Sequence, residues 1–134
     1  MNQKEKAEAI KRQLVIINKL LKKPENKYCA DCKRTSPSWA NINLGVFVCI
    51  NCSGCHREIG VHVTKIKSVN LDVWSEDTLK YFQKINNEIA NEYWEYKLKN
   101  FDFWGITFYL NYYIIFLIFP IIYNGILISH SSSL

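Results

Sequence analysis

The sequence predicts an α+β domain in which a short antiparallel sheet is surrounded by helices, followed by a hydrophobic C-terminal segment. Three observations predict this class. Two Cys-x-x-Cys pairs stand sixteen residues apart, an apolar stripe of helical period precedes them, and a run of β-branched and aromatic residues leads into the second pair. A chain of 134 residues has room for one such domain with a core of its own.

The composition changes along the chain, and this change suggests a boundary. We expect one domain at residues 1–99 and an atypical hydrophobic tail at 100–134. Within the domain we expect an N-terminal helix at 5–23, a cysteine-bearing module at 26–70 and further helices at 75–99.

The prediction of the N-terminal helix rests on four apolar residues at intervals of four, three and four: Ile10, Leu14, Ile17 and Leu21. This spacing forms one stripe on a helix with 3.6 residues per turn, and Pro24 is expected to stop the helix. Residues 1–27 carry eight Lys or Arg against three Glu, which equals the formal net charge of +5 for the whole chain. Such a basic arm suggests attraction to an anionic membrane surface or an acidic partner, although a solvated helix face is the more ordinary explanation of this charge pattern.

The two cysteine pairs are Cys29 with Cys32 and Cys49 with Cys52. Two such knuckles fold together so that four thiolates meet at the corners of a tetrahedron, which is the arrangement of structural zinc. We therefore predict one structural Zn²⁺ rather than two disulfides, and no secretory signal is visible that would favour disulfides. Because four thiolates close the site, the metal should do no hydrolytic chemistry. Cys55 is expected to be a small packing residue.

The remaining elements follow from local signals. The segment 46–49, Val-Phe-Val-Cys, reads as a strand of a hairpin that delivers the second cysteine pair beside the first. A short helix is expected at 53–60 and a strand at 63–69. Ser75 should cap the next helix, and another helix should run through Ala90 and Trp94.

The residue strings around the cysteines narrow the class of protein further than the cysteine spacing alone does. They are SGCHREIGVH at 53–62, Pro-x-Trp-Ala at 37–40, Gly-Val-Phe-Val-Cys at 45–49 and the segment 67–74. Together they resemble the zinc-finger domain of the GTPase-activating proteins that act on ADP-ribosylation factors, the ArfGAP family. The resemblance runs from about Leu14 to Trp94, which is most of the chain.

The resemblance implies a GTPase activator, not an enzyme with turnover of its own, whose partner is an Arf-type small GTPase in its GTP-bound form. Arg57 stands at the position of the family's catalytic arginine, which enters the GTPase site in trans. Trp39 and Ile50 resemble positions on the GTPase-facing surface, and an ordinary core role is the alternative for each. Lys67 stands where the family usually has Arg, so a contact with the GTPase would be weaker. We also count His56 with this surface, and expect it, like His62, to be a hydrogen-bonded support of the Arg57 segment.

Two other functions compete with this one. GATA-type nucleic-acid fingers use two Cys-x-x-Cys pairs at nearly the same separation, but they need a basic segment directly after the fourth cysteine. Here that segment is SGCHREIGVH, with one arginine, so no nucleic acid is expected as a partner. A scaffold that docks without activating the GTPase is the third possibility. No G-x-x-x-x-G-K-[ST] loop is present, so nucleotide would have to come from the partner.

The tail has no charged residue from Phe103 to Ser129. Its length and apolar character are compatible with a transmembrane anchor, with an alternative C-terminus that replaces the last helices of the domain, or with a buried helix of the same fold. From the resemblance we expect a cytoplasmic protein at Golgi or vesicle membranes.

Overall fold

The computed structural model describes residues 1–96. The elements in chain order are α1 (Gln3–Leu21), the 3₁₀ turn η1 (Pro24–Asn26), β1 (Trp39–Asn41), β2 (Val46–Val48), α2 (Ile50–Ile59), β3 (Ile66–Ser68), α3 (Glu76–Lys84) and α4 (Asn87–Trp94). This is the α+β class predicted from the sequence, with helices around a small sheet. The expected tail at 100–134, and the end of the expected helical region, lie outside the described residues. Within residues 1–96, none of the helices combines the length and the apolar character that crossing a bilayer requires.

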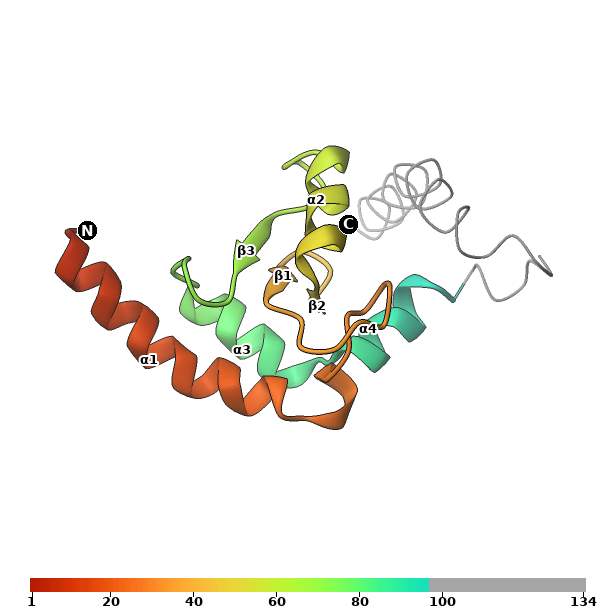
Figure 1. Cartoon of the computed structure of the whole chain (residues 1–134), viewed down its shortest axis with the longest axis horizontal. Helices are drawn as coiled ribbons and strands as arrows, with labels where there is room; N and C mark the ends of the chain where they lie inside the picture. Colours follow the sequence, from red (N-terminus) through yellow and green to blue (C-terminus); the bar gives the residue numbers. More distant parts are fainter. Residues whose placement is uncertain (97–134) are drawn as a thin grey trace, which may run out of the picture. The chain divides into compact units, whose positions relative to one another are not determined.

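The sheet has three antiparallel strands in the order β2-β1-β3. Ala40 in the central strand lies opposite Phe47 on one side and Lys67 on the other. In Figure 1, α2 lies above the sheet, while α1 and α3 run side by side below it. The expected hairpin is therefore present, and it leads directly into α2. The expected strand at 63–69 is shorter than predicted, because only Ile66–Ser68 pairs with β1.

The core lies between the sheet and the helices. Three aromatic rings meet at its centre: Phe82 lies 5.1 Å from Phe47 and 5.0 Å from Trp74, measured between ring centroids. The other buried members of this cluster are Ile17, Leu20, Ala40 and Val69. Edge-to-face contacts between such rings add about 0.5–1.5 kcal/mol each to the free energy gained from burial alone.

Helix α1 begins and ends two residues earlier than predicted. Asn2 forms a capping box with Glu5, which fixes the start at Gln3. Lys23 is extended, as expected for a residue before proline, so the helix ends at Leu21, one residue before its C-cap.

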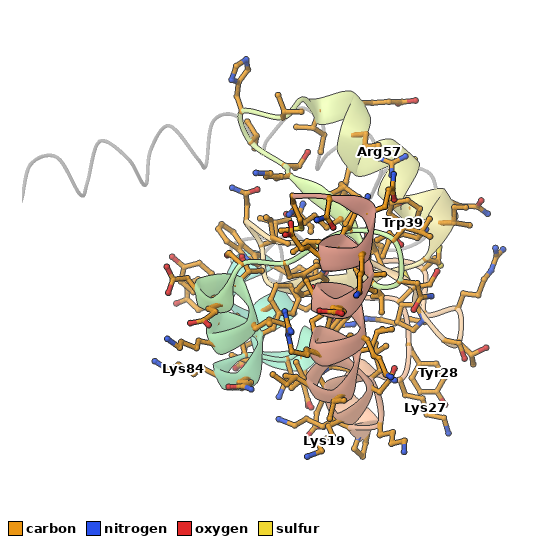
Figure 2. All side chains as sticks on the ribbon, turned by 90° about the vertical axis from the view of Figure 1, so that its left-hand side faces the viewer. Lys19, Lys27, Tyr28, Trp39, Arg57 and Lys84 are labelled. Atoms are coloured by element: carbon orange, nitrogen blue, oxygen red, sulfur yellow. The ribbon has the colours of Figure 1, made fainter. Side chains whose placement is uncertain are left out.

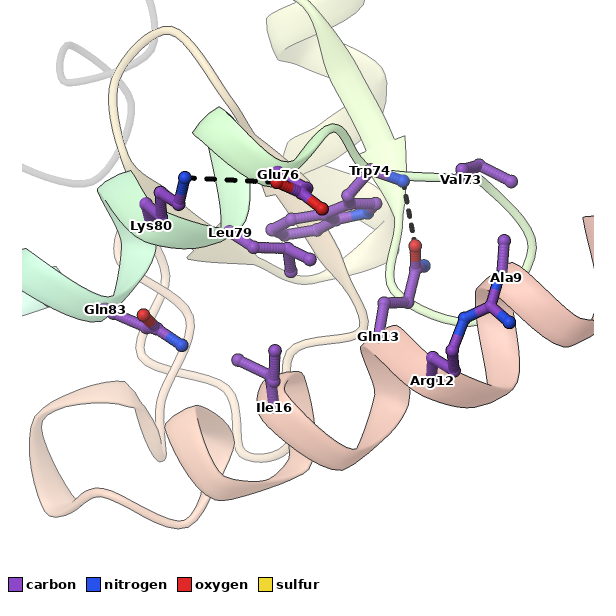
Figure 3. A pocket seen from close by; sticks show the side chains of 10 residues that line it. All are labelled: Ala9, Arg12, Gln13, Ile16, Val73, Trp74, Glu76, Leu79, Lys80 and Gln83. Carbon is purple, nitrogen blue, oxygen red and sulfur yellow. Dashed lines mark hydrogen bonds and ion pairs between the residues drawn. The ribbon is translucent and has the colours of Figure 1, made fainter.

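The buried face of α1 also differs from the predicted stripe, since it consists of Gln13, Ile17 and Leu20. The buried Gln13 bridges two backbone groups of the loop before α3. Its Nε2 donates to the carbonyl of Asp72 at 2.6 Å, and its Oε1 accepts from the N–H of Trp74 at 2.9 Å. Figure 3 shows this second bond at the side of the groove between α1 and α3.

Asn87 at the start of α4 holds the outer edge of the sheet. Its Oδ1 accepts from the N–H of Phe47 at 2.7 Å, and its Nδ2 donates to the carbonyls of Phe47 and Tyr28. The backbone N–H of Asn87 donates to Asn26, whose Nδ2 donates to the carbonyl of Leu20 at the end of α1. Two buried asparagines thus tie α1, β2 and α4 together and fix the segment that enters the first cysteine pair.

Candidate metal centre and the Arg57 surface

The four predicted cysteine ligands come together. The sulfur atoms of Cys29, Cys32, Cys49 and Cys52 all lie within 4.8 Å of one another, and the pair from Cys32 and Cys49 is 3.6 Å apart. Zinc–sulfur bonds of about 2.3 Å in a tetrahedron place sulfurs about 3.8 Å apart. The donor set and its spacing therefore fit a single structural Zn²⁺, as predicted. When bound, the ion supplies the positive charge that keeps these thiols ionised.

Each cysteine pair is presented by a defined local structure. In the first, the N–H of Lys33 donates to the carbonyl of Cys29 at 3.1 Å, and Lys33 takes the left-handed backbone (φ 63°) that turns the chain back. In the second, Cys49 caps α2, and its sulfur accepts from the N–H of Cys52 at 3.4 Å. A helix N-terminus favours a thiolate, so the start of α2 suits metal ligation. Helix α2 begins at Ile50, earlier than the predicted residue 53, because Cys49 takes this capping role.

The surroundings of the site shift the pKa values of two thiols in opposite directions. The bond with Cys52, helped by backbone bonds at Cys49, Cys32 and Asp31, lowers the pKa of Cys29 from 9.0 to about 5, although burial acts in the opposite direction. Burial is the main cause that raises the pKa of Cys32. Before a metal binds, the hydrogen bond with Cys52 therefore favours the thiolate form of Cys29.

Arg57 and Trp39 lie on the same face of the molecule. Arg57, exposed on α2, places its guanidinium carbon 4.5 Å from the centroid of the Trp39 ring, which belongs to β1. Figure 2 shows the two side chains together near the end of the domain that carries α2. A cation held over an indole ring gains about 0.5–1 kcal/mol at an exposed site. The stacking restricts the arginine without burying its hydrogen-bond donors.

The other predicted site residues have different environments. Ile50 is 62% exposed at the first position of α2, and Trp39 is half-buried beneath Arg57. Lys67 is half-buried, and its Nζ donates to the carbonyl of Val73. His62 is exposed in the turn after α2. Lys67 is therefore engaged with its own chain, whereas Ile50 offers an apolar side chain to the solvent.

His56 points into the domain, only 7% exposed. Its Nε2 lies 2.6 Å from a carboxylate oxygen of Asp31, and its Nδ1 lies 2.9 Å from Nδ2 of Asn41. Its backbone carbonyl accepts a bond from the hydroxyl of Thr64. Sequence reasoning missed Asp31, Asn41 and Thr64, because their partner lies between 8 and 25 residues away. The only signal available was the place of Asp31 between two ligand cysteines.

These features define a small α+β domain with a closed four-cysteine metal centre and an exposed arginine on the helix that leaves it. A family profile described as "Putative GTPase activating protein for Arf", ArfGap, matches residues 15–105. The chain belongs to the ArfGAP family, as the sequence motifs predicted.

Individual relatives agree with the profile. The chain is 46% identical over 83 residues to "Probable ADP-ribosylation factor GTPase-activating protein AGD15" of Arabidopsis thaliana, a match that covers 62% of this chain and 36% of the relative. It is 51% identical over 81 residues to "ADP-ribosylation factor GTPase-activating protein effector protein 2" of Saccharomyces cerevisiae, covering 59% and 27%. The matched region is thus about a third or less of these relatives' own length.

A solved structure matches as well. The crystal structure of a "putative GTPase activating protein for ADP ribosylation factor" from Cryptosporidium parvum superposes with a TM-score of 0.65 and 30% sequence identity. This match covers 73% of this chain and 77% of the other chain.

Proposed function

We propose that this chain accelerates GTP hydrolysis by an Arf-type small GTPase in its GTP-bound form, with Arg57 as an arginine finger on a zinc-stabilised platform. The observation that carries the proposal is the exposed guanidinium of Arg57, stacked on Trp39, on the helix whose N-cap and first turn provide two of the metal ligands. Membership of the ArfGAP family supports the class of activity.

An arginine is suited to the chemistry of phosphoryl transfer. The transition state of phosphoryl transfer carries negative charge that the GTPase alone neutralises poorly, and an arginine supplied in trans accelerates the reaction by about 10³–10⁵-fold. That range corresponds to about 4–7 kcal/mol of activation free energy. The planar guanidinium offers paired donors to phosphate oxygens, which a lysine ammonium does not.

We place the surface that contacts the GTPase around Arg57. Trp39 orients the guanidinium, and the exposed Ile50 at the start of α2 supplies apolar contact area. His56 and Lys67 support this surface from inside the domain, because both side chains form hydrogen bonds within it.

We further propose that an anionic membrane surface is bound by the end of the domain opposite Arg57, which would hold the protein at vesicle or Golgi membranes. Exposed lysines gather there in the last turns of α1 and α3 and directly after η1, and Figure 2 shows Lys19, Lys27 and Tyr28 at that end. Within residues 1–96, neither Lys19, Lys27 nor Lys84 forms an ion pair. Each such lysine near an anionic bilayer contributes about 1 kcal/mol.

The membrane proposal is tested by sedimenting the full chain with phosphatidylserine vesicles. Reversal of Lys19, Lys27 and Lys84 to Glu should release it, whereas the same reversal of Lys4 and Lys6 near the other end of α1 should not. If the variant with three reversed lysines sediments with the vesicles as well as the variant with two, this assignment of the surface is refuted.

The catalytic proposal is tested by single-turnover GTP hydrolysis on Arf proteins, with the wild-type chain and with Arg57→Lys and Arg57→Ala. Both substitutions should remove about 10³-fold or more of the stimulation while one zinc per chain and the melting temperature are retained. Arg34→Ala, at another exposed arginine of the zinc module, is the matched control and should stimulate normally. Undiminished stimulation by Arg57→Ala would remove this residue from the mechanism.

A further inference from the structure

We propose that Asp31 is a positioning residue for Arg57, acting through a hydrogen bond to His56. This inference rests on the proposed function, since it concerns how the finger is held. Asp31 lies between the two ligands of the first cysteine pair, and His56 directly precedes Arg57 on α2. The bond between them, at 2.6 Å, joins two segments that lie 25 residues apart.

The hydrogen-bond network determines which imidazole nitrogen carries the proton. Oδ1 of Asn41 accepts from the N–H groups of Asn43 and Leu44, both at 3.1 Å. The amide nitrogen of Asn41 therefore faces Nδ1 of His56, and because it can only donate, Nδ1 must accept. The proton is then on Nε2, which donates to the carboxylate of Asp31.

This arrangement holds the imidazole ring from both sides. Asn41 belongs to β1 and Asp31 to the first cysteine pair, so a single side chain of α2 is fixed to the sheet and to the metal centre. The hydroxyl of Thr64 adds a third bond, to the backbone carbonyl of His56. Both ring nitrogens and the backbone carbonyl of His56 therefore have hydrogen-bond partners. In a buried position, each such group left without a partner costs about 1–3 kcal/mol.

The orientation of His56 sets the orientation of Arg57. Consecutive residues on an α-helix point about 100° apart, so an inward imidazole directs the next side chain outward over Trp39. If the bond to Asp31 is lost, α2 is free to shift along or about its axis, and the guanidinium moves with it. A displacement of about 1 Å at a reacting centre can cost about 10²-fold in rate.

A positioning role and a purely stabilising role predict different kinetics. A residue that only stabilises the fold lowers the fraction of active protein, which the zinc content and the thermal melt reveal. A residue that positions the finger lowers kcat while the KM for the GTP-loaded partner changes little, because the docking surface is intact.

The kinetic test compares Asp31→Ala with Asp31→Asn in the full chain, with Glu25→Ala as an exposed carboxylate control. Asp31→Ala should lower kcat by about 10–100-fold and change KM by less than about threefold. Asp31→Asn retains an oxygen that accepts from Nε2, so its kcat should lie within about threefold of wild type. Normal kcat in Asp31→Ala, or equal loss in both Asp31 variants, would overturn the proposal.

A second measurement needs no GTPase and thus separates this inference from the proposed function. In the wild-type chain, nitrogen-15 NMR should show His56 protonated at Nε2 only, and the ring current of Trp39 should shift the Arg57 side-chain protons upfield. Asp31→Ala should diminish that upfield shift. The opposite tautomer in the wild-type chain overturns the inference even if Asp31→Ala fails to fold. Absence of any stimulation by the wild-type chain would instead refute the proposed function.

Discussion

Replacing Asn87 with alanine should be one of the most destabilising single changes in this domain. Asn87 is 3% exposed, and its side chain makes three hydrogen bonds to main-chain groups of β2 and of the segment before the first cysteine pair. In Asn87→Ala the N–H of Phe47 loses its acceptor at 2.7 Å and stays buried. The carbonyl of Phe47 keeps one donor, the N–H of Ala30 at 3.0 Å.

These contacts determine how much free energy of unfolding Asn87→Ala should lose. An orphaned buried N–H costs about 1–3 kcal/mol, and each of the two lost carbonyl bonds adds about 1 kcal/mol. Alanine returns about 0.6 kcal/mol through its higher helix propensity. The net loss is then about 3 kcal/mol, which lowers the melting temperature of a domain near 100 residues by about 12–24 °C.

The assay is thermal unfolding followed by circular dichroism, with zinc present in slight excess for every variant. Asn18→Ala provides the matched control, because it makes the same chemical change at an exposed position of α1 and should leave the melting temperature within about 3 °C. A melting temperature for Asn87→Ala as close to wild type as that of the control would refute the reasoning that these bonds anchor the sheet edge.

Two further predictions concern the metal and the hairpin turn. Chelation of zinc should abolish the cooperative melt, and re-addition should restore it, because a metal that holds four cysteines of one small domain contributes its binding free energy to folding. A melt unchanged by chelation would contradict a structural site. Gly45→Ala should cost about 1–3 kcal/mol, because φ is +73° and the new Cβ would stand 2.8 Å from the hydroxyl of Tyr81. Gly54→Ala, which meets nothing within 4 Å inside α2, should be neutral or slightly stabilising, and an equal loss at both glycines would exclude this cause.

The parts of the structure that the sequence predicts well are those set by local chemistry. Four cysteines at a defined spacing have few ways to satisfy one metal ion, so the ligand set follows from spacing alone. Ser75 caps α3 through a bond to the N–H of Thr78, as expected for a serine before two acidic residues. The hairpin between β1 and β2 follows from the β-branched run and the turn before it.

The parts that were missed depend on pairs of residues far apart in the chain. Asp31 and His56 are 25 residues apart, and Asn26 and Asn87 are 61 residues apart. A polar residue that satisfies a buried backbone group resembles, in the sequence, one that faces water. Periodicity cannot separate the two, because the partner belongs to another element.

Gln13 is the clearest example of a buried polar residue that sequence periodicity does not detect, and its contribution to stability can be tested. The apolar stripe predicts that a leucine at this buried position would extend the core-facing surface of α1. The structure predicts the opposite result, because Gln13→Leu leaves the buried N–H of Trp74 without its acceptor, at a cost of about 1–3 kcal/mol, and also removes the bond to Asp72. We expect a net loss of about 1–2 kcal/mol in the free energy of unfolding, measured by urea titration. Lys11→Leu, an exposed position on the same helix, should change it by less than about 0.5 kcal/mol. A gain in stability for Gln13→Leu would mean that burial of apolar surface, rather than completion of backbone hydrogen bonds, decides how α1 packs.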